Sequence, residues 1–375
     1  MKQKLVVIGG NYFQLPLVKK AQEMGLEVHC FAWEEGAVCK DVADYFYPIS
    51  IVEKEQILGI CRSLGVDGII SIASDLAVLT VNYVAEQMGL IGNKDKYSLV
   101  QTNKYLMRQC FEDADVPSPR YCLVKSIGDA LSFEGWQWPL IVKPTDRSGS
   151  RAVVKVENYE QLKIAAKEAI DVSFAKEAIV EEFVSGQEVS VEAISWGGQH
   201  YILQITDKVT NEHFVEIAHH QPSLLPNMIQ DRIRAVVLKA LDALHVEYGA
   251  SHSELKITDD GSVKVMEIGA RMGGGFIGSH LVPLSTGYDY VRGVIEIALG
   301  YFNKPVINKN LCSGVFFLIQ ETSYLLPIIQ ESDRYPEIVF AKRTEETIRP
   351  GVSESNRTGY VIYQSNHRIN SFKHD

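Results

Sequence analysis

The stretch KVMEIGARMGGGFIGSH, residues 264–280, contains two charged side chains that could do chemistry, Glu267 and Arg271. They interrupt an otherwise apolar strand, and the glycines 273–275 follow them. One interpretation is a strand that ends in a flexible hairpin, with both charges facing water. The other is a binding site, because glycines let the backbone approach a ligand closely. The rest of the sequence must decide between the two.

A second carboxylate, Glu254, lies in the preceding segment SHSELKI, and the turn TDDG at residues 258–261 joins the two segments. Asp-Gly in such a turn is typical of a β-hairpin. Pairing through this turn brings Glu254 and Glu267 roughly opposite one another, where two like charges destabilise a sheet unless something neutralises them. Mg²⁺ held by one or two carboxylates and by substrate phosphates does this at nucleotide sites. The hairpin is therefore predicted to be a metal clamp.

Two lysines could contact phosphate. Lys143 ends the apolar strand PLIVKP, and the loop TDRSGSR, residues 145–151, follows it. Such a loop offers backbone N–H groups and cations to phosphate oxygens. Lys104 lies in TNKYLMRQ, on a predicted helix. Simpler interpretations stay open at this point: Lys143 extends its charge into water, and Lys104 is an ordinary solvated lysine.

The segment IVEEFVSGQEVSVE places Glu181 and Glu182 after an apolar strand, with Glu188 seven residues past Glu181. A strand that ends at a hinge between two lobes presents backbone N–H and C=O groups to a planar base. A nearby carboxylate can accept a hydrogen bond from a ribose hydroxyl. The segment is either a nucleotide-binding hinge of this kind or a charged connector.

Composition limits the class of protein. A chain of 375 residues is too long for one ordinary core, so two or three domains are expected. The net charge of −10 argues against a nucleic-acid or anionic-membrane partner. The six cysteines form no C-x-x-C pair and are expected to be reduced thiols of a cytoplasmic protein. The run LVVI near the start is shorter than the roughly 7–15 residues of a signal-peptide core, and no stretch approaches the ~18 apolar residues of a membrane span.

The order of predicted elements indicates the domain organisation. Strand and helix patterns alternate over residues 1–95, which predicts a βαβ unit with a parallel sheet. Residues 96–118 are predicted to link this unit to the next, with one helix over 96–115 and two prolines after it. Residues 119–185 are predicted to form a small strand-rich lobe and residues 186–310 a larger central lobe. Residues 311–375 are predicted to close the larger lobe.

In combination, these features resemble the ATP-grasp superfamily, and they occur in its order over about residues 1–310. Within the superfamily, the sequence is similar to the bacilysin-type L-amino-acid ligases and related carboxylate–amine ligases. The stretches that carry this similarity are GGNYFQLPLVKKA, SDLAVLTVNYVAEQMGLIG, TNKYLMR, GASHSEL and EIGARMGGGFIGSHLVPLSTGYD. The resemblance implies a mixture of α/β and α+β structure: an ATP-grasp fold with an N-terminal parallel βαβ domain, a small ATP lobe and a larger central lobe.

The resemblance also implies which residues bind ATP. Its phosphates would contact Lys104, Lys143 and the loop 145–151, chiefly Ser148, Gly149 and Ser150. The hinge would hold the base and the sugar: Glu181 and the backbone of Val184 would hold adenine, and Glu188 would hold the ribose. Glu182 would be a further ATP-binding residue.

The remaining residues would serve the metal and the second substrate. Glu254 and Glu267 would bind one or two Mg²⁺ ions, with Mn²⁺ as an alternative. Arg271, with Lys143, would assist catalysis by neutralising an acyl phosphate. His252, Gly273 and Gly274 would border the amino-acid substrate.

The resemblance leads to an expected activity and leaves alternatives. The expected protein is an ATP-dependent ligase that joins a small carboxylate to an amine, both expected to be amino acids, and a homodimer is among the expected assemblies. Many ATP-grasp enzymes carry E-x-N where this chain has Gly269 after Glu267, and the L-amino-acid ligases look similar here. The glycines after Arg271 argue against a carboxylase.

Three other functions remain open. They are an ATP-grasp enzyme for a nucleotide-pathway or sugar-linked acid, an ATP-binding regulatory module, and an NAD-binding dehydrogenase. The dehydrogenase rests only on the turn Gly9-Gly10-Asn11, which lacks the full G-x-G-x-x-G pattern.

Overall fold

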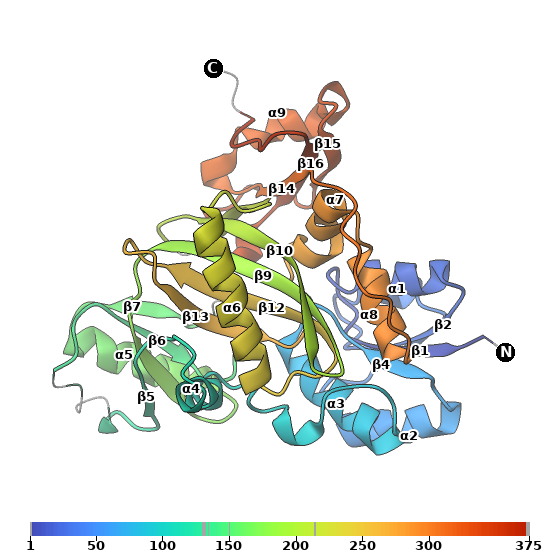
Figure 1. Ribbon diagram of the computed structural model, residues 1–375, viewed down its shortest axis with the longest axis horizontal. Coiled ribbons are helices and arrows are strands. Elements are labelled where there is room, and N and C mark those ends of the chain that lie inside the picture. The colour runs from blue at the N-terminus through green and yellow to red at the C-terminus, as the bar shows by residue number, and fades with distance from the viewer. Residues whose placement is uncertain (1, 130–132, 134, 150, 214, 373–375) are drawn as a thin grey trace.

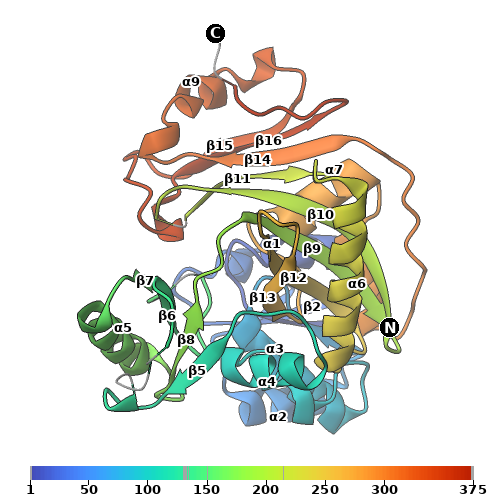
Figure 2. The same ribbon diagram turned by 60° about the vertical axis from the view of Figure 1, so that its left-hand side comes forward.

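The computed structural model describes residues 2–129, 133, 135–149, 151–213 and 215–372, and it contains three β-sheets (Figures 1 and 2). The N-terminal sheet is parallel and has the strand order β3-β2-β1-β4. Its strands are β1 (Lys4–Ile8), β2 (Glu27–Phe31), β3 (Tyr45–Tyr47) and β4 (Gly68–Ile70), and its helices are α1 (Leu15–Glu23), α2 (Lys54–Leu64) and α3 (Asp75–Met88). The predicted parallel N-terminal unit is confirmed.

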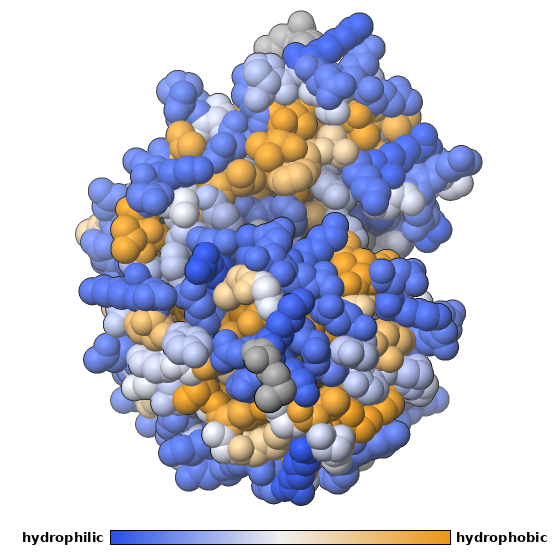
Figure 3. All heavy atoms as spheres, turned by 90° about the vertical axis from the view of Figure 1, so that its right-hand side faces the viewer, coloured by the Kyte–Doolittle hydropathy of each residue, from blue (hydrophilic) through white to orange (hydrophobic). Residues whose placement is uncertain are grey.

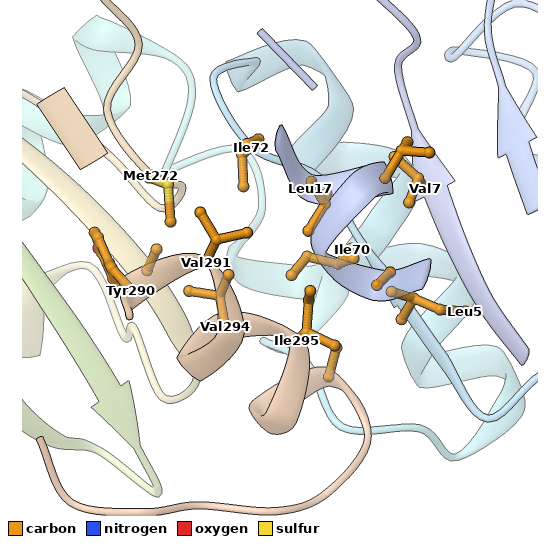
Figure 4. Close-up of a cluster of buried hydrophobic side chains, with 14 of the residues drawn as sticks. Leu5, Val7, Leu17, Ile70, Ile72, Met272, Tyr290, Val291, Val294 and Ile295 are labelled. Atoms are coloured by element: carbon orange, nitrogen blue, oxygen red, sulfur yellow. The ribbon is translucent and has the colours of Figure 1, made fainter. Parts of the chain in front are cut away.

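Both faces of this sheet are covered because alternate residues of a strand point to opposite sides. Leu5 and Val7 pack with α1 and with α8 (Tyr290–Ala298), whereas Val6 and Ile8 pack with α2 and α3. Figure 4 shows α8 lying over the first of these faces. Since α8 also contacts the large sheet, it fixes the N-terminal unit against the elements that carry the candidate site.

The prediction of one helix over residues 96–115 is wrong. A 3₁₀ turn spans Asp95–Tyr97, and helix α4 (Lys104–Asp113) begins only after Asn103. The Asn103 side chain accepts hydrogen bonds from the backbone N–H groups of Tyr105 (3.0 Å) and Leu106 (3.1 Å), which is how asparagine caps a helix N-terminus. Lys104 is therefore the first residue of a helix and not a mid-helix lysine.

The small lobe is an antiparallel sheet of order β5-β8-β6-β7, covered by α5 (Tyr159–Val172). Its strands are β5 (Tyr121–Val124), β6 (Leu140–Pro144), β7 (Val154–Val156) and β8 (Ala178–Glu182). Leu162, Ala165 and Ala169 on α5 face the strands and are buried. The end of β6 carries Lys143, and the end of β8 carries Glu181 and Glu182.

The large sheet has eight strands in the order β13-β12-β9-β10-β11-β14-β16-β15. They are β9 (Gln187–Trp196), β10 (Gln199–Thr210), β11 (Glu216–Gln221), β12 (Gly249–Ile257), β13 (Val263–Gly269), β14 (Cys312–Phe317), β15 (Ile338–Arg343) and β16 (Gly359–Ser365). Helix α6 (Asn227–Ala243) covers one face. A π-helical turn (Ile277–Leu281) and the helices α7 (Val282–Thr286) and α9 (Leu325–Gln330) complete the fold. The segment after residue 311 thus adds three strands to the large sheet.

The molecular surface is mixed. Figure 3 shows one face on which hydrophilic residues surround separate apolar patches. None of the helices in the described part of the chain combines the length and apolarity that a bilayer crossing requires.

Candidate active site

The two predicted phosphate lysines are buried and paired. Lys104 is 4% exposed and Lys143 is 7% exposed, so neither extends into bulk water. Lys104 Nζ lies 2.7 Å from Glu267 Oε1 and donates a hydrogen bond of 2.6 Å to the backbone carbonyl of Arg147. Burial lowers the pKa of Lys143 from its ordinary value, whereas Glu267 raises the pKa of Lys104 although burial opposes this. Lys104 therefore joins the predicted metal clamp to the predicted phosphate loop.

Glu181 lies between two buried cations. Its carboxylate is 2.8 Å from Arg108 Nη2 and 2.7 Å from Lys143 Nζ. Burial alone would raise the pKa of Glu181, but these two cations hold it below its ordinary value. Sequence reasoning missed Arg108. A single arginine on an amphipathic helix gives no signal that it pairs with a carboxylate on a distant strand. The Glu181 side chain positions Lys143.

The side chain of Glu182, the further predicted ATP-binding residue, lies apart from the rest of the hinge. Side chains alternate along a strand, so Glu182 points away from the face that Glu181 uses. Its carboxylate pairs with Lys264, and both residues line a separate cavity with Arg120 and Tyr121. The cavity in front of the hinge is instead lined by Glu181, Glu188 and the apolar residues Ile141, Phe183, Val184 and Met266.

The predicted carboxylate pair is confirmed in its geometry, since Glu254 and Glu267 are register partners on β12 and β13. Both line the same cavity. No cluster of three or more His, Cys, Asp or Glu side chains suited to a metal occurs among the described residues. Two carboxylates nevertheless fit Mg²⁺, which is commonly bound through one or two carboxylates plus phosphates and water. Glu254 and Glu267 could hold the ion, and phosphate oxygens would supply further ligands.

Lys208 on β10 is a further charged residue of the site that sequence reasoning missed. Its Nζ lies 3.0 Å from Glu188, 2.5 Å from Glu216 and 2.9 Å from Glu254. Although burial opposes it, these carboxylates raise the pKa of Lys208 well above its ordinary value. The cluster depends on strands β9 to β12 lying side by side, which no local sequence pattern shows.

Arg271 reaches the same cavity from a loop. Strand β13 ends at Gly269, so the expectation that Arg271 and Glu267 share a strand is wrong. The Arg271 guanidinium instead makes two hydrogen bonds to Asp75 at the start of α3, of 2.8 Å and 3.0 Å. A Cβ atom at Gly269 would lie 2.5 Å from Asp75 Oδ1. The glycine at this position therefore leaves room for the Arg271–Asp75 pair, and Asp75 is a site residue that the sequence did not reveal.

His252 forms part of a buried acidic network. Its Nδ1 lies against the carboxylate of Glu192, and its Nε2 is 3.4 Å from Glu254 Oε1. Burial opposes the charge, but Glu192 and Glu254 raise the pKa of His252 to about 9. His252 thus carries a positive charge at neutral pH and faces the candidate metal ligand.

The glycine loop serves the protein's own packing. Gly273 N–H donates a 3.0 Å hydrogen bond to Glu192, and a Cβ atom at Gly273 would lie 2.5 Å from Glu192 Oε1 and 2.6 Å from His252 Nδ1. The structure therefore gives an internal reason for a glycine at this position, and its predicted contact with the substrate stays a prediction. A Cβ atom at Gly274 would meet its nearest atom, on Ala73, at 3.7 Å, which is ordinary contact.

The predicted phosphate loop is held at its base. Asp146 accepts hydrogen bonds from the backbone N–H groups of Phe174 (3.2 Å) and Ala175 (2.7 Å), and Arg147 Nε donates to the carbonyl of Val172 (2.5 Å). Ser148 and Gly149 line the cavity, and the predicted contact at Ser150 lies outside the described residues. The anchored base places the loop opposite the carboxylate pair.

The glycine turn near the N-terminus is filled by a side chain. Gln14 accepts a hydrogen bond from Asn11 N–H (3.1 Å) and donates to the carbonyl of Ile72 (2.6 Å). A Cβ atom at Gly9 would lie 3.1 Å from Gln14 Cδ. A dinucleotide would need that space, so the structure gives no support to an NAD site here.

Comparisons with known proteins identify a domain family and several named relatives. Residues 136–280 match the ATP-grasp domain model. The chain is 26% identical over 279 residues to an alanine–anticapsin ligase from Bacillus subtilis (strain 168), covering 65% of this chain and 58% of that protein. It is 24% identical over 271 residues to the carbamoyl phosphate synthase large chain from Caldanaerobacter subterraneus subsp. tengcongensis, covering 68% of this chain and 24% of that protein. The chain thus spans only 58% of the length of the alanine–anticapsin ligase.

Solved structures show the same architecture. An L-amino acid ligase from Bacillus licheniformis superposes with a TM-score of 0.82 at 22% identity, covering 98% of this chain and 94% of that one. N5-carboxyaminoimidazole synthetase from Staphylococcus aureus, complexed with ADP, gives 0.79 at 17% identity, covering 98% and 95%. The chain therefore has the ATP-grasp fold. The curated relatives that it resembles include enzymes named as ligases.

Proposed function

We propose that the protein is an ATP- and Mg²⁺-dependent carboxylate–amine ligase that joins two amino acids through an acyl phosphate. The observation that carries the proposal is the meeting of four charged elements at one cavity: two buried lysines, the Glu254–Glu267 pair, Arg271 and the loop 145–149. Its likeness to proteins named as alanine–anticapsin ligase and L-amino acid ligase supports the choice of amino acids as substrates.

The first step activates the acid. A carboxylate oxygen attacks the γ-phosphorus of ATP, the bond to the bridging oxygen breaks, and ADP leaves. Lys104 and Lys143 hold the phosphates, while Ile141, Phe183, Val184 and Met266 form the apolar slot for adenine. Bound at Glu254 and Glu267, Mg²⁺ would neutralise phosphate charge. Catalysis of this kind is mostly positioning and electrostatics.

The second step forms the amide. The amine attacks the acyl carbon, phosphate leaves, and the nitrogen loses its proton. Arg271 faces the cavity with its guanidinium held by two hydrogen bonds to Asp75. A fixed cation of this kind can stabilise charge that develops during transfer without reorganising. Loop 145–149 lies on the opposite side, where it would keep water from the acyl phosphate.

A binding-only regulatory module is a weaker candidate, because ATP binding alone gives no reason for an arginine held beside the metal carboxylates. An enzyme for a nucleotide-pathway acid shares the ATP half of the site, and structures of such enzymes share the fold. The two ligase candidates differ in the second substrate, which a substrate screen distinguishes directly.

The test is a phosphate-release screen with ATP, Mg²⁺ and all pairs of amino acids, followed by mass analysis of the products. We expect phosphate release that requires amino acids and a product whose mass is that of the pair minus one water. Glu267→Gln serves as the inactive control. Phosphate release with nucleotide-linked acids, and with no amino-acid pair, would reject the proposal.

A further inference from the structure

A buried carboxylate beside the site has no part in the mechanism above. Glu192 lies on β9 and is fully buried. The described residues that line the cavities at the site include His252 but not Glu192, so the Glu192 carboxylate would touch neither ATP nor the acid and amine. Removing a carboxylate from water is costly unless it is paired and hydrogen-bonded. The contacts that Glu192 makes therefore bear on why a carboxylate stands at this position.

The first contact joins Glu192 to the predicted metal clamp. Glu192 and His252 are register partners on the neighbouring strands β9 and β12, and Glu192 Oε1 lies against His252 Nδ1. The other ring nitrogen of His252, Nε2, is 3.4 Å from Glu254 Oε1. The three side chains therefore form a chain, in which Glu192 fixes the direction of the imidazole ring and the ring reaches the predicted metal ligand.

The second contact joins Glu192 to the loop that carries Arg271. Glu192 Oε2 accepts a 3.0 Å hydrogen bond from the backbone N–H of Gly273, two residues after Arg271. On its other side the loop is held by the N-terminal unit, where Ala73 N–H donates to the carbonyl of Met272 (3.1 Å). Glu192 therefore supplies the tie between this loop and the large sheet.

Packing alone does not explain the carboxylate. A buried charged group can be replaced by an apolar residue of similar volume with little or no loss of stability. Such a residue at position 192 could not accept the Gly273 N–H, and it would leave His252 without its partner. A Cβ atom at Gly273 would lie 2.5 Å from Glu192 Oε1 and 2.6 Å from His252 Nδ1. The loop, the ring and the carboxylate therefore fit together with no room to spare.

We propose that Glu192 is a positioning residue, which holds Glu254 through His252 and the Arg271 loop through Gly273 in one fixed arrangement. Groups behind a metal ligand orient it, and their loss typically costs about 10–100-fold in metal affinity or activity. The inference rests on Mg²⁺ binding at Glu254, which is part of the proposed function. It does not depend on which acid and amine the protein joins.

The experiment measures the affinity for a non-hydrolysable ATP analogue by calorimetry, once with saturating Mg²⁺ and once with EDTA. The ratio of the two affinities reports the contribution of the metal, whereas a general loss of structure would lower both. Glu192→Gln keeps the shape of the side chain and an acceptor for Gly273 N–H, but it removes the charge that holds His252. We expect it to lower the affinity for the Mg²⁺ complex about tenfold or more. The affinity without Mg²⁺ should stay within a fewfold.

Two further variants test the links separately. His252→Asn keeps a donor near the position of Nδ1 but cannot reach Glu254, so it should lower the same ratio by a similar factor. The double variant of Glu192→Gln and His252→Asn should lower it no further, because the two residues act in series. In Gly273→Ala the added methyl group would push against the contact between Glu192 and His252. This variant should give the same loss as Glu192→Gln.

The matched control is Asp207→Asn. Asp207 is also a buried carboxylate of the large sheet, on β10, and it pairs with Arg368. It is absent from the described residues that line the cavities at the site. Loss of its charge should lower the free energy of unfolding, measured with denaturant, and leave the ratio of the two affinities unchanged.

The outcomes separate this inference from the ligase proposal. A loss confined to the Mg²⁺ complex, shared by the three single variants and not increased in the double variant, supports the inference. An unchanged ratio in Glu192→Gln, losses that add in the double variant, or a wild-type affinity that Mg²⁺ does not raise would overturn it. Because nucleotide binding is measured without turnover, a failed amino-acid screen would reject the ligase proposal and leave this result standing.

Discussion

Two neighbouring cavities at the site share Asp75, Lys104 and Glu267 but differ in size, about 200 Å³ against about 1020 Å³, and in the rest of their lining. The smaller one is dense with charge, and its lysines and carboxylates are paired before any ligand arrives: Lys104 with Glu267, Lys143 with Glu181, Lys208 with Glu254. The larger one is lined in part by exposed apolar side chains, such as Leu99 and Phe174, and in part by polar and charged ones, such as Arg151. Under the proposed function, the smaller cavity would bind ATP and the larger one would leave room for the second reactant. Changes in the first should affect every substrate, and changes in the second only some.

The largest expected effect is at the carboxylate pair. Glu267→Gln should lower amino-acid-dependent phosphate release by about 10³-fold or more, since metal charge neutralisation contributes several kcal/mol to phosphoryl transfer. The loss should be the same for every substrate pair. The matched control is Glu182→Gln, because Glu182 lies on the far side of the hinge and pairs with Lys264. Near-normal turnover of Glu267→Gln at saturating Mg²⁺ would remove Glu267 from the metal ligands.

The next effect is at Arg271, which lines the smaller cavity. Arg271→Ala should lose on the order of 10²-fold in kcat, by analogy with removal of an oxyanion donor, while ATP affinity stays within a fewfold. Asp75→Asn, which leaves Arg271 present but without its charged partner, should lower kcat in the same direction and by less. Titration of ATP and a coupled phosphate assay measure the two quantities. A parallel collapse of affinity and turnover would make Arg271 an ATP anchor.

A smaller effect is expected on nucleotide binding. Lys143→Ala should weaken ATP binding by roughly 1.5–3 kcal/mol, the scale of a charged hydrogen bond, which corresponds to about 10–150-fold in Kd. Part of this loss would come from Glu181, which would keep only Arg108 as a partner. Lys163→Ala on the outer face of α5, which removes a surface ion pair with Glu160, is the control. Unchanged ATP affinity in Lys143→Ala would contradict the assigned contact.

The smallest effect lies outside both cavities and concerns stability. Burial, with a contribution from Arg368, lowers the pKa of His220 on β11 to about 3. Between pH 6.5 and 3 the unfolded chain therefore binds a proton that the folded chain does not, and the free energy of unfolding falls as pH falls. The slope from this residue should approach about 1.4 kcal/mol per pH unit.

His220→Asn, which can keep a hydrogen bond to Tyr363, should remove that part of the slope. Denaturant unfolding from pH 7 to pH 5 measures it for wild type and variant. Identical slopes in the two proteins would show that His220 does not take up the proton on unfolding.

The sequence predicted the features that depend on local pattern. Alternating strand and helix signals gave the parallel N-terminal sheet, and an Asp-Gly turn placed Glu254 opposite Glu267, as the register shows. It could not predict pairs between distant elements, because no local signal exists for them. Asp75 and Arg271 are 196 residues apart, and Lys208 meets Glu254 only through the order of strands in the large sheet.

The predictions that failed did so at single residues. One cap at Asn103 moved the start of α4 to Lys104, and side-chain alternation along β8 turned Glu182 away from the site. The strand that was expected to carry Arg271 ends two residues earlier, at Gly269. In each case a single residue changed the assignment, which is below the scale that hydrophobic periodicity resolves.

The central claim is that the charged cavity activates a carboxylate by phosphorylating it. The most direct measurement uses the pair of amino acids that the screen identifies, with the carboxylate oxygens of each labelled in turn with ¹⁸O. An acyl phosphate requires one carboxylate oxygen to leave with the phosphate, so the released phosphate should contain one ¹⁸O atom per turnover from one of the two amino acids and none from the other. Phosphate that carries no label from either amino acid, while product still forms, would contradict the account.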